Sequence, residues 1–381
     1  MQNNSPTGIA VVGAGYWGPN LVRNAQATPG LRLEYLCDLD PERARRVLGE
    51  YSTVRISTSI DEVLDDPAVS AVAIATPVST HHPIALKALE SGRHVLVEKP
   101  LALNYDQGHE LVAAAEANGR VLMLDHTYVY TPAVRKIREL VRDGALGELQ
   151  YLDSVRINLG LVQPDVDVLW DLAPHDLSIF EAILPDDVWP VSVAAHGSDP
   201  IGAGQACVAH LTIRLSNGAL AHVHVNWLSP TKIRTFVVGG SLRTVVWDDL
   251  NPSQLISVHD RGVDKVAREL GPDTRGRTIV SYRTGDMIAP ALPNQEALRS
   301  VMVEFRDAIT EGRPALTDGW AGLRVLALLE AASMSLGKDG ISIPVRDIQG
   351  APSQHLRRDD AGPEDDGPIE QSRRGRGEVT V

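Results

Sequence analysis

Residues 9–18 read Ile-Ala-Val-Val-Gly-Ala-Gly-Tyr-Trp-Gly, an apolar run that ends in a loop with three glycines. The run predicts a buried strand, and the residues up to Ala27 predict a helix. The spacing G-x-G-x-x-G lets the first glycine turn tightly, the second admit a pyrophosphate, and the third pack helix on strand. This loop therefore predicts a dinucleotide-binding fold, with these residues at the cofactor: Gly13, Gly15, Tyr16, Trp17 and Gly18.

Asp38 supports the prediction that the glycine loop binds a dinucleotide. It ends the second apolar run, Leu31–Cys37, and follows Gly15 at the distance where a carboxylate can hold the ribose hydroxyls of the adenosine. A carboxylate at this point repels a 2′-phosphate. The sequence therefore favours NAD over NADP as the cofactor.

The first 128 residues alternate short apolar runs with helical patterns, which predicts a parallel sheet covered on both faces. The further strands are expected at Val69–Ala75, His94–Val97 and Val121–Leu124. The further helices are expected at Pro41–Glu50, Pro83–Ser91 and Tyr105–Asn118. We expect residues 1–128 to form a doubly wound Rossmann domain.

Residues 129–350 have a different pattern and predict an α+β domain that binds substrate and forms oligomers. Helices are expected at Ala133–Arg142, Pro174–Leu184, Gln295–Glu311 and Gly319–Leu336, and consecutive alternating strands between residues 188 and 247 predict an open, mostly antiparallel sheet. Residues 351–381 hold three prolines, several glycines and mixed charge without an aromatic residue. We expect this tail to be disordered.

The composition narrows the function classes. A net charge of −13 disfavours binding to nucleic acid or to an anionic membrane. Residues 1–7 are polar without the apolar core of a signal peptide, and Arg324 and Glu330 interrupt the most apolar late segment. The two cysteines, Cys37 and Cys207, are expected to be buried free thiols, which suits a reducing cytoplasm.

Two segments carry candidate catalytic groups. Lys99 follows the apolar run Val95–Val97, and ligands of open α/β sheets lie beyond such strand ends. Pro100 keeps Lys99 out of helical geometry. Further along, Asp171 is expected to cap the helix near Pro174, which leaves His175 in its first turn. His175 follows Asp171 by four positions, so the carboxylate could orient the imidazole as an acid/base unit.

These motifs together resemble the Gfo/Idh/MocA family of oxidoreductases. The resemblance rests on Gly13–Gly18, the Thr76-Pro77…His81 stretch, Glu98-Lys99-Pro100 and Asp171-x-x-x-His175, and it spans about residues 8–340. It implies a Rossmann domain followed by an α/β domain with an open sheet. It also implies hydride transfer between a nicotinamide cofactor and hydroxyl groups of sugars, nucleotide sugars or cyclitols.

The resemblance assigns roles residue by residue. Lys99 matches the catalytic lysine, and Asp171 and His175 match the catalytic aspartate and histidine. It implies that four residues line the cofactor, namely Thr76, Pro77, His81 and Glu98. Trp170 is expected beside the nicotinamide or the substrate. In alcohol oxidation His175, oriented by Asp171, would accept the hydroxyl proton while Lys99 stabilises the developing negative charge, although Lys99 could itself carry the proton.

Several polar residues of the second half are weaker candidates. Arg156 and Asn158 share a strand face and could bind sugar hydroxyls or a phosphate. Three residues at the rim of the sheet could also touch substrate, namely Trp227, Lys232 and Arg234. His222, His224 and Asn226 share the open face of the sheet, and without an obvious third ligand we expect no metal. In the family such open faces contact other subunits, so the resemblance implies a homodimer or homotetramer.

A sugar or nucleotide-sugar dehydrogenase is the leading hypothesis for the function. Around Asp125–Tyr128 and Trp170–His175 the chain resembles family members that act on nucleotide-linked sugars, while the Asp-x-x-x-His arrangement resembles the inositol-dehydrogenase-like branch and keeps a cyclitol as the alternative. A non-catalytic NAD-binding sensor, and a hydrolase or lyase that recycles its NAD, remain further alternatives. The sequence does not indicate which carbon is oxidised or in which direction.

Overall fold

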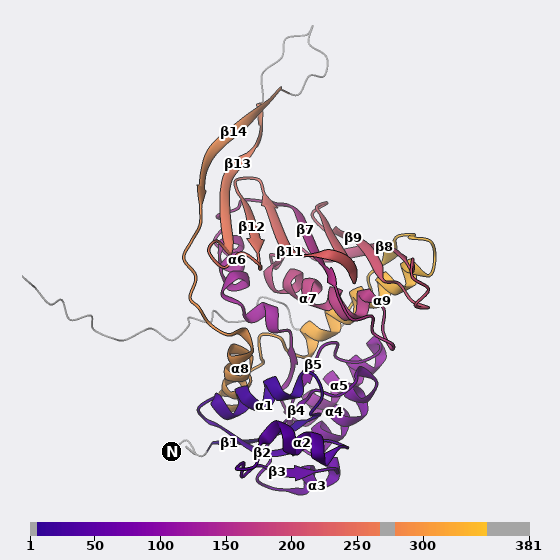
Figure 1. Cartoon of the computed structure of the whole chain (residues 1–381). Helices are drawn as coiled ribbons and strands as arrows, with labels where there is room; N and C mark the ends of the chain where they lie inside the picture. The colour runs from indigo at the N-terminus through magenta and orange to yellow at the C-terminus, as the bar shows by residue number, and fades with distance from the viewer. Residues whose placement is uncertain (1–5, 267–278, 349–381) are drawn as a thin grey trace, which may run out of the picture.

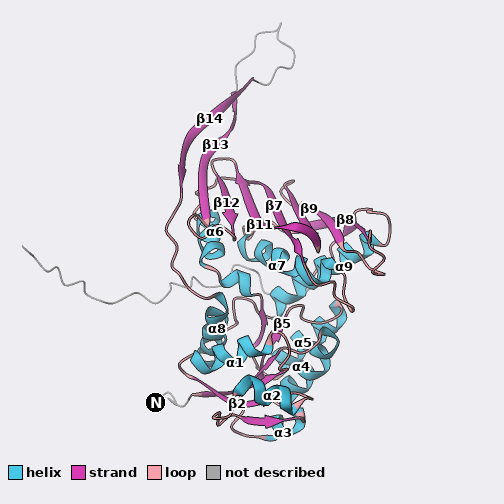
Figure 2. Cartoon of the chain, viewed as in Figure 1, coloured by secondary structure: helices cyan, strands magenta, loops and turns pink. Residues whose placement is uncertain are grey.

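Two β-sheets organise the structure, a computed structural model that describes residues 6–266 and 279–348. The first sheet occupies the N-terminal part of the chain, and the second lies above it in Figure 1. Figure 2 shows helices on both sides of the first sheet and on the inner side of the second. The expected fold class, a parallel Rossmann sheet followed by a mostly antiparallel sheet, is confirmed.

The first sheet is parallel and has the strand order β3-β2-β1-β4-β5-β6. Its strands are β1 (Thr7–Val12), β2 (Leu31–Cys37), β3 (Arg55–Ser57), β4 (Ala71–Ile74), β5 (His94–Glu98) and β6 (Leu122–Asp125). The order reverses direction between β1 and β4, and ligands of such sheets bind at this switch point beyond the strand ends. The sequence analysis did not predict β3 or the helix α3 (Ile60–Asp65) that follows it.

Helices cover both faces of this sheet, as its continuous apolar strands require. One face packs against α1 (Gly18–Ala27), and the other packs against α4 (His81–Glu90) and α5 (Tyr105–Ala117). A shorter helix, α2 (Pro41–Leu48), follows β2, and Asp40 caps it by accepting from two backbone N–H groups. Two short 3₁₀ turns, η1 (Val78–Thr80) and η2 (Thr127–Tyr130), follow β4 and β6.

The second sheet has the order β14-β13-β12-β11-β7-β10-β9-β8-β15. Its strands are β7 (Leu149–Leu159), β8 (Pro190–Ser198), β9 (Val208–Leu215), β10 (Leu220–Asn226), β11 (Leu228–Gly240), β12 (Thr244–Asp248), β13 (Ile256–Val266), β14 (Ile279–Ile288) and β15 (Ile343–Pro344). Only β7 and β10 pair in parallel; the other described pairings are antiparallel. In Figure 1, β13 and β14 extend beyond the rest of the sheet.

The inner face of the second sheet is the apolar one. Its alternate residues pack against α7 (Val168–Ile183), with α6 (Pro132–Arg142) and α9 (Gly319–Leu336) beside it. The intervening positions face outward, where polar residues surround a few valines such as Val155 and Val237, and no described helix covers them. This alternation is what a sheet with one buried face requires.

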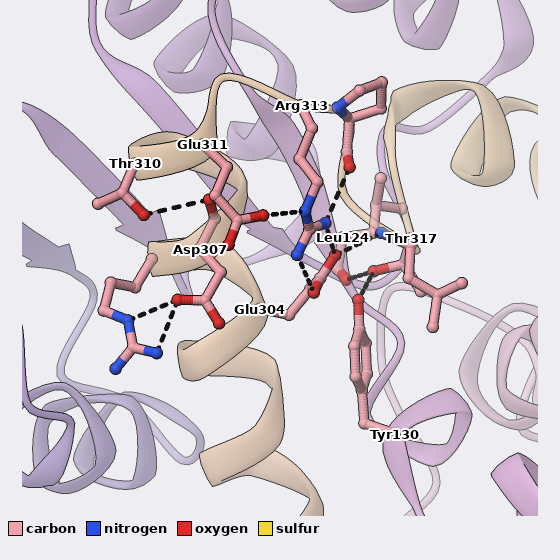
Figure 3. Close-up of polar contacts among 11 residues, drawn as sticks. Leu124, Tyr130, Glu304, Asp307, Thr310, Glu311, Arg313 and Thr317 are labelled. Carbon is pink, nitrogen blue, oxygen red and sulfur yellow. Dashed lines mark hydrogen bonds and ion pairs between the residues drawn. The ribbon is translucent and has the colours of Figure 1, made fainter. Parts of the chain in front are cut away.

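The chain returns to the first sheet after completing the second. Helix α8 (Ala297–Glu311) packs beside α1 on the first sheet, with Phe305 fully buried there. Beyond α8, the backbone N–H of Leu124 in β6 donates to the carbonyl of Thr317 at 2.8 Å, and the Thr317 hydroxyl lies 2.9 Å from the Tyr130 hydroxyl (Figure 3). Part of the expected 129–350 unit therefore completes the first domain. The expected tail, 351–381, lies outside the described residues.

Candidate active site

The glycine loop has the shape that a dinucleotide requires. Gly13 has φ +101°, and a Cβ there would lie 2.5 Å from the carbonyl oxygen of Ala75. A Cβ on Gly18 would lie 2.1 Å from the carbonyl oxygen of Gly13. In contrast, a Cβ on Gly15 would meet no described atom within 4 Å. Two glycines are therefore needed for packing, while the third leaves open space where a pyrophosphate can approach the backbone.

Asp38 lies beside this loop, at the end of β2. Its carboxylate accepts from the backbone N–H of Ala14 at 2.6 Å and of Asp40 at 2.8 Å. Trp17 precedes α1 and donates its indole N–H to Asp125 at 3.1 Å, which ties the loop to the end of β6. Tyr16 points outward and is 93% exposed. The loop, Asp38 and Trp17 thus form one connected wall at the carboxyl ends of β1, β2 and β6.

The Thr76–His81 segment contacts the backbone that follows the end of β5. His81 is buried, with Nδ1 2.8 Å from the carbonyl of Pro100 and Nε2 2.9 Å from the carbonyl of Thr76. Burial lowers the pKa of His81, although both carbonyls oppose that shift. Pro77 begins the turn η1. His81 therefore joins the backbone of the Thr76 segment to that of Lys99-Pro100, whose peptide bond is cis.

Glu98 and Asp125 are register partners at the ends of β5 and β6. Burial, and then the charge of Asp125, raise the pKa of Glu98 well above its usual range. One oxygen of Glu98 accepts from the backbone N–H of Lys99 at 3.1 Å. Protonation of Glu98 is therefore favoured, because like charges at adjacent strand ends disfavour double ionisation.

Lys99 reaches from the first domain to α7. Its Nζ donates to the backbone carbonyl of Asp171 at 2.8 Å and to Oδ1 of the same residue at 3.2 Å. The other carboxylate oxygen, Oδ2, accepts from the indole N–H of Trp227 at 3.0 Å. The structure thus brings Lys99 and Trp227 to Asp171, although they lie 72 and 56 positions from it in the sequence.

His175 lies one turn further along α7, against the ring of Tyr128 with centroids 5.0 Å apart. Burial, followed by the charges of Lys99 and Arg156, holds the pKa of His175 well below its usual range. Its Nδ1 is buried and finds no hydrogen-bond partner among the described residues. The expected hydrogen bond between Asp171 and His175 is absent from the described contacts; Oδ1 of Asp171 accepts from Lys99 and Oδ2 from Trp227.

The start of α7 also differs from the sequence expectation. The helix begins at Val168, and its cap is Asp167, which accepts from the backbone N–H of Trp170 at 3.0 Å. Asp171 consequently lies in the first turn and is not the cap, while Pro174 lies inside the helix. A proline has no N–H, so the carbonyl four residues earlier, that of Trp170, loses its helical partner, and the ring crowds this turn. The carbonyl of Asp171, three residues before Pro174, is the one that Lys99 reaches.

Three other predicted residues have no hydrogen bond or ion pair with Lys99 among the described contacts. Trp170 donates its indole N–H to Ser333 of α9 at 2.8 Å, which anchors it between helices. Arg156 is buried in a two-bond ion pair with Asp176 at 2.9 and 3.0 Å, and its guanidinium lies 4.3 Å from the Tyr128 ring centroid. Asn158 lies two residues further along β7, near Gly160. Arg156 therefore binds α7 and packs on Tyr128. The N–H groups that donate to Asp176 are not available to a substrate.

The weaker rim candidates also separate in the structure. Trp227 is buried, Lys232 is exposed, and Arg234 pairs with Asp249 at 3.3 Å. His222 and His224 lie on the open face, where the ring of His224 stacks on His210 at 4.0 Å. Within residues 6–266 and 279–348, no group of three His, Cys, Asp or Glu side chains is arranged to hold a metal.

Two further observations concern the rest of the chain. Cys37 and Cys207 are buried free thiols, as expected. None of the helices in the described ranges is long and apolar enough to cross a membrane.

The sequence analysis named Trp227 and the run Asp125–Tyr128, but it missed the part that four of these residues play in the site. Trp227 as the partner of Asp171, Asp125 as the partner of Trp17, and Tyr128 beside His175 all depend on tertiary contacts. His126, fully buried with neither ring nitrogen bonded to a described atom, is the fourth. The run Asp125–Tyr128 directly follows a predicted strand at the ligand-binding edge of the sheet, and that position was the available signal.

A Rossmann sheet with a fitted glycine loop, joined to a second domain that meets Lys99, defines an NAD-dependent oxidoreductase. Two family models match the chain: an oxidoreductase family with an NAD-binding Rossmann fold over residues 7–126, and the GFO/IDH/MocA C-terminal domain over residues 134–246. The chain belongs to the GFO/IDH/MocA family of oxidoreductases, as the resemblance implied, and its first domain binds NAD.

Several relatives share most of this architecture. UDP-N-acetylglucosamine 3-dehydrogenase of Acidithiobacillus ferrooxidans is 29% identical over 83% of this chain and 93% of its own, and its solved structure superposes with a TM-score of 0.72 over 87% of this chain and 97% of its own. The scyllo-inositol 2-dehydrogenase (NAD⁺) of Bacillus subtilis is 28% identical over 60% of this chain and 70% of its own. GenD2 from gentamicin A biosynthesis, solved with NAD, is 26% identical with a TM-score of 0.74, covering 90% of this chain and 97% of its own.

Proposed function

We propose that this chain transfers a hydride between NAD and a secondary alcohol or ketone of a sugar or nucleotide sugar. The observation that carries the proposal is the meeting of Lys99 with Asp171 across the two domains, with His175 one turn further along α7. A lysine and a histidine from different domains can address one oxygen of a substrate held between them. A nicotinamide cofactor supplies the hydride chemistry when it is bound.

The protonation states suggest a division of labour. Because burial and nearby cations lower the pKa of His175, its imidazole is neutral near pH 7 and can accept the hydroxyl proton. Lys99 donates to the same oxygen and stabilises the negative charge that develops there. Asp171 holds Lys99 in place and does not orient His175. In the reducing direction the same groups return the proton to a ketone.

Nucleotide sugars are the preferred substrate class. One relative that aligns over nearly its full length acts, by its name, on a UDP-linked amino sugar, while the scyllo-inositol 2-dehydrogenase aligns over a smaller share of both chains. This difference supports a nucleotide-linked sugar, with a free cyclitol as the alternative.

The test is NADH absorbance after addition of NAD and one compound from a panel of UDP- and dTDP-sugars, free sugars and cyclitols. We expect steady NADH production with one class, and loss of at least about a hundredfold in kcat for Lys99→Met and His175→Asn. Both variants should keep their affinity for NAD, measured by quenching of tryptophan fluorescence. Lys87→Met and His82→Asn are matched controls, because these residues pair on the surface with Asp61 and Glu110.

Three results would replace the proposal. Tight NAD binding without turnover of any polyol would indicate a sensor. Conversion of a compound without net NADH would indicate a hydrolase or lyase that recycles its cofactor. A preference for NADP would overturn the role given to Asp38.

We also propose that two chains associate through the open face of the second sheet and that the protein works in the cytoplasm. The centre of this face carries Val155 and Val237, with histidines and charged residues around them. Sedimentation velocity tests the association: Val155→Lys with Val237→Glu should give a monomer if the wild type is a dimer. A wild type that sediments as a monomer at micromolar concentration would contradict it.

A further inference from the structure

Trp227 bonds Asp171, the residue of the second domain that Lys99 reaches from the first domain. It lies at the junction of β10 and β11, is 1% exposed, and donates its indole N–H to Oδ2 of Asp171 at 3.0 Å. The opposite oxygen, Oδ1, accepts from Lys99 at 3.2 Å. The carboxylate of Asp171 is therefore held from both sides, by a rigid buried donor on one side and a flexible ammonium on the other.

The backbone fixes the indole itself. The N–H of Trp227 donates to the carbonyl of Cys207 at 3.0 Å, and its carbonyl accepts from the N–H of Gly160 at 2.8 Å. A Cβ on Gly160 would lie 3.3 Å from Cδ1 of Trp227, the ring atom bonded to the donating nitrogen. The backbone of residue 160 thus lies against the edge of the indole that faces Asp171. Such packing leaves the donor little freedom to turn away.

We propose that Trp227 is a positioning residue for the reaction, acting through Asp171 on Lys99. A carboxylate with one free oxygen rotates about its last torsion, because the barrier is low and the preference is broad. A charge-assisted bond from a buried indole sets that torsion and leaves the second oxygen aimed at Lys99. The Lys99 ammonium is then presented at the carboxyl edge of the first sheet, where its oxygen ligand would lie. This inference rests on the proposed function.

Close packing alone does not explain why the indole N–H of Trp227 bonds Asp171. A buried tryptophan usually finds a partner for its N–H, and a nearby backbone carbonyl would serve that need. Here the N–H meets the one carboxylate that also binds the lysine from the other domain. Trp320 offers an internal comparison, because its indole N–H donates to Glu116 at 2.9 Å, away from Lys99.

The first experiment needs no substrate. The chain has six tryptophans, so the indole N–H region of a nitrogen-proton correlation spectrum of the full-length protein is simple to assign, and Trp227→Phe identifies the resonance. We expect Asp171→Asn and Lys99→Met to shift the Trp227 resonance and to leave that of Trp320 in place. A Trp227 resonance that does not respond to Asp171→Asn would overturn the linkage, whether or not any compound is turned over.

The second experiment measures catalysis with the compound that the panel identifies. Trp227→Phe should lower kcat/KM by about tenfold or more with an unchanged NAD affinity, since bonds to charged groups have roughly that effect. The acid limb of its pH profile should move to higher pH, because a carboxylate that loses a donor is protonated more readily. Trp320→Phe, which removes a similar bond elsewhere, should keep both the rate and the profile.

Gly160→Ala covers the case in which Trp227→Phe does not fold. The added methyl would lie 2.9 Å from Nδ2 of Asn158, the end of a flexible side chain that can turn aside. It would also lie 3.3 Å from Cδ1 of the indole, which must move by a few tenths of an ångström, and the glycine φ does not forbid alanine. We expect a smaller fall in kcat/KM with the same displacement of the acid limb. Trp227→Phe or Gly160→Ala is compared with Trp320→Phe, depending on which of the first two folds. If the rate and the pH profile are equal to those of Trp320→Phe, the positioning role is wrong.

Discussion

Arg156 is a residue that the sequence offers as a substrate ligand but that the fold uses in a buried ion pair. It lies on the inner face of the second sheet, and its side chain and that of Asp176 are 5% and 1% exposed. Burial lowers the pKa of Arg156, but Asp176 and Tyr128 outweigh burial and raise it overall. The pair therefore stays ionised inside the protein and holds α7 against β7.

Removing one member of this pair should destabilise the protein strongly. We expect Arg156→Met to lower the free energy of unfolding by about 3–5 kcal/mol, because Asp176 remains as a buried charge. Urea denaturation followed by circular dichroism measures the change. Combining Arg156→Met with Asp176→Leu should recover most of the loss, since neither partner is then charged. A double variant as unstable as the single one would contradict this account.

The residue types of the site could be predicted from the sequence, but their partners could not. Lys99, Asp171 and His175 stand at a strand end and in one helix, and the structure places Lys99 on Asp171. The spacing of Asp171 and His175 permits a hydrogen bond between them. Two stronger donors from distant segments, Lys99 and Trp227, bind the carboxylate instead, and local spacing carries no information about them.

At the level of single elements, the glycine loop separates a packing requirement from a binding requirement. A Cβ on Gly18 would overlap the carbonyl of Gly13, whereas a Cβ on Gly15 has open space. The two positions should therefore respond differently to alanine although both belong to one motif.

We expect Gly15→Ala to keep the melting temperature of the free protein while weakening NAD binding by at least about tenfold, because the methyl occupies the approach of the pyrophosphate. Gly18→Ala should instead lower the melting temperature of the free protein by several degrees. Differential scanning fluorimetry and NAD titration separate the two effects. Equal melting temperatures for both variants would contradict the distinction.

The elements with strong periodic patterns were predicted well, and the failures have local causes. The second strand, Leu31–Cys37, matches its prediction residue for residue. Helix α7 begins six residues before the predicted start at Pro174. The start was predicted there because proline is favoured at the first position of a helix. Asp167 caps the true start, and packing of α7 on the second sheet stabilises a proline within it. The three-residue strand β3 is too short to show a pattern.

Over the whole molecule, several buried histidines make stability depend on pH. Burial lowers the pKa of His81, His94, His126 and His175, to about 4 for His94 and to about 3 for His126, where Lys99 contributes as well. Below the unfolded value of about 6.5, the unfolded chain binds protons that the native state does not. The free energy of unfolding should therefore fall as pH decreases from about 6.5 towards these lower values.

His126 gives this dependence a specific test. It should contribute about 1.4 kcal/mol per pH unit between pH 6 and pH 4, measured by urea denaturation at each pH. His126→Leu should flatten the curve by that amount and cost little at pH 7, because neither ring nitrogen bonds to a described atom. His222→Leu is the control, since His222 is exposed on the open face. An identical slope for both variants would contradict the assignment.

The two-sheet architecture followed from the sequence, but the path of the chain between the sheets did not. Alternating and continuous apolar patterns specify which faces of each element are buried. They do not specify which sheet a late helix joins. Helix α8 is amphipathic and could pack on either sheet, and its placement on the first depends on the apolar surface beside α1.

The return of α8 means that the cofactor-binding half cannot be excised as a continuous piece of gene. A fragment ending at residue 128 would expose the sheet surface that five α8 residues cover, namely Leu298, Val301, Met302, Phe305 and Ala308, each at most 4% exposed. We expect that fragment to aggregate on expression, and a graft of residues 295–318 through a flexible linker to restore a monomer that binds NAD. Size-exclusion chromatography with NAD titration decides between them. Recombination between relatives should accordingly succeed only when both segments are exchanged together.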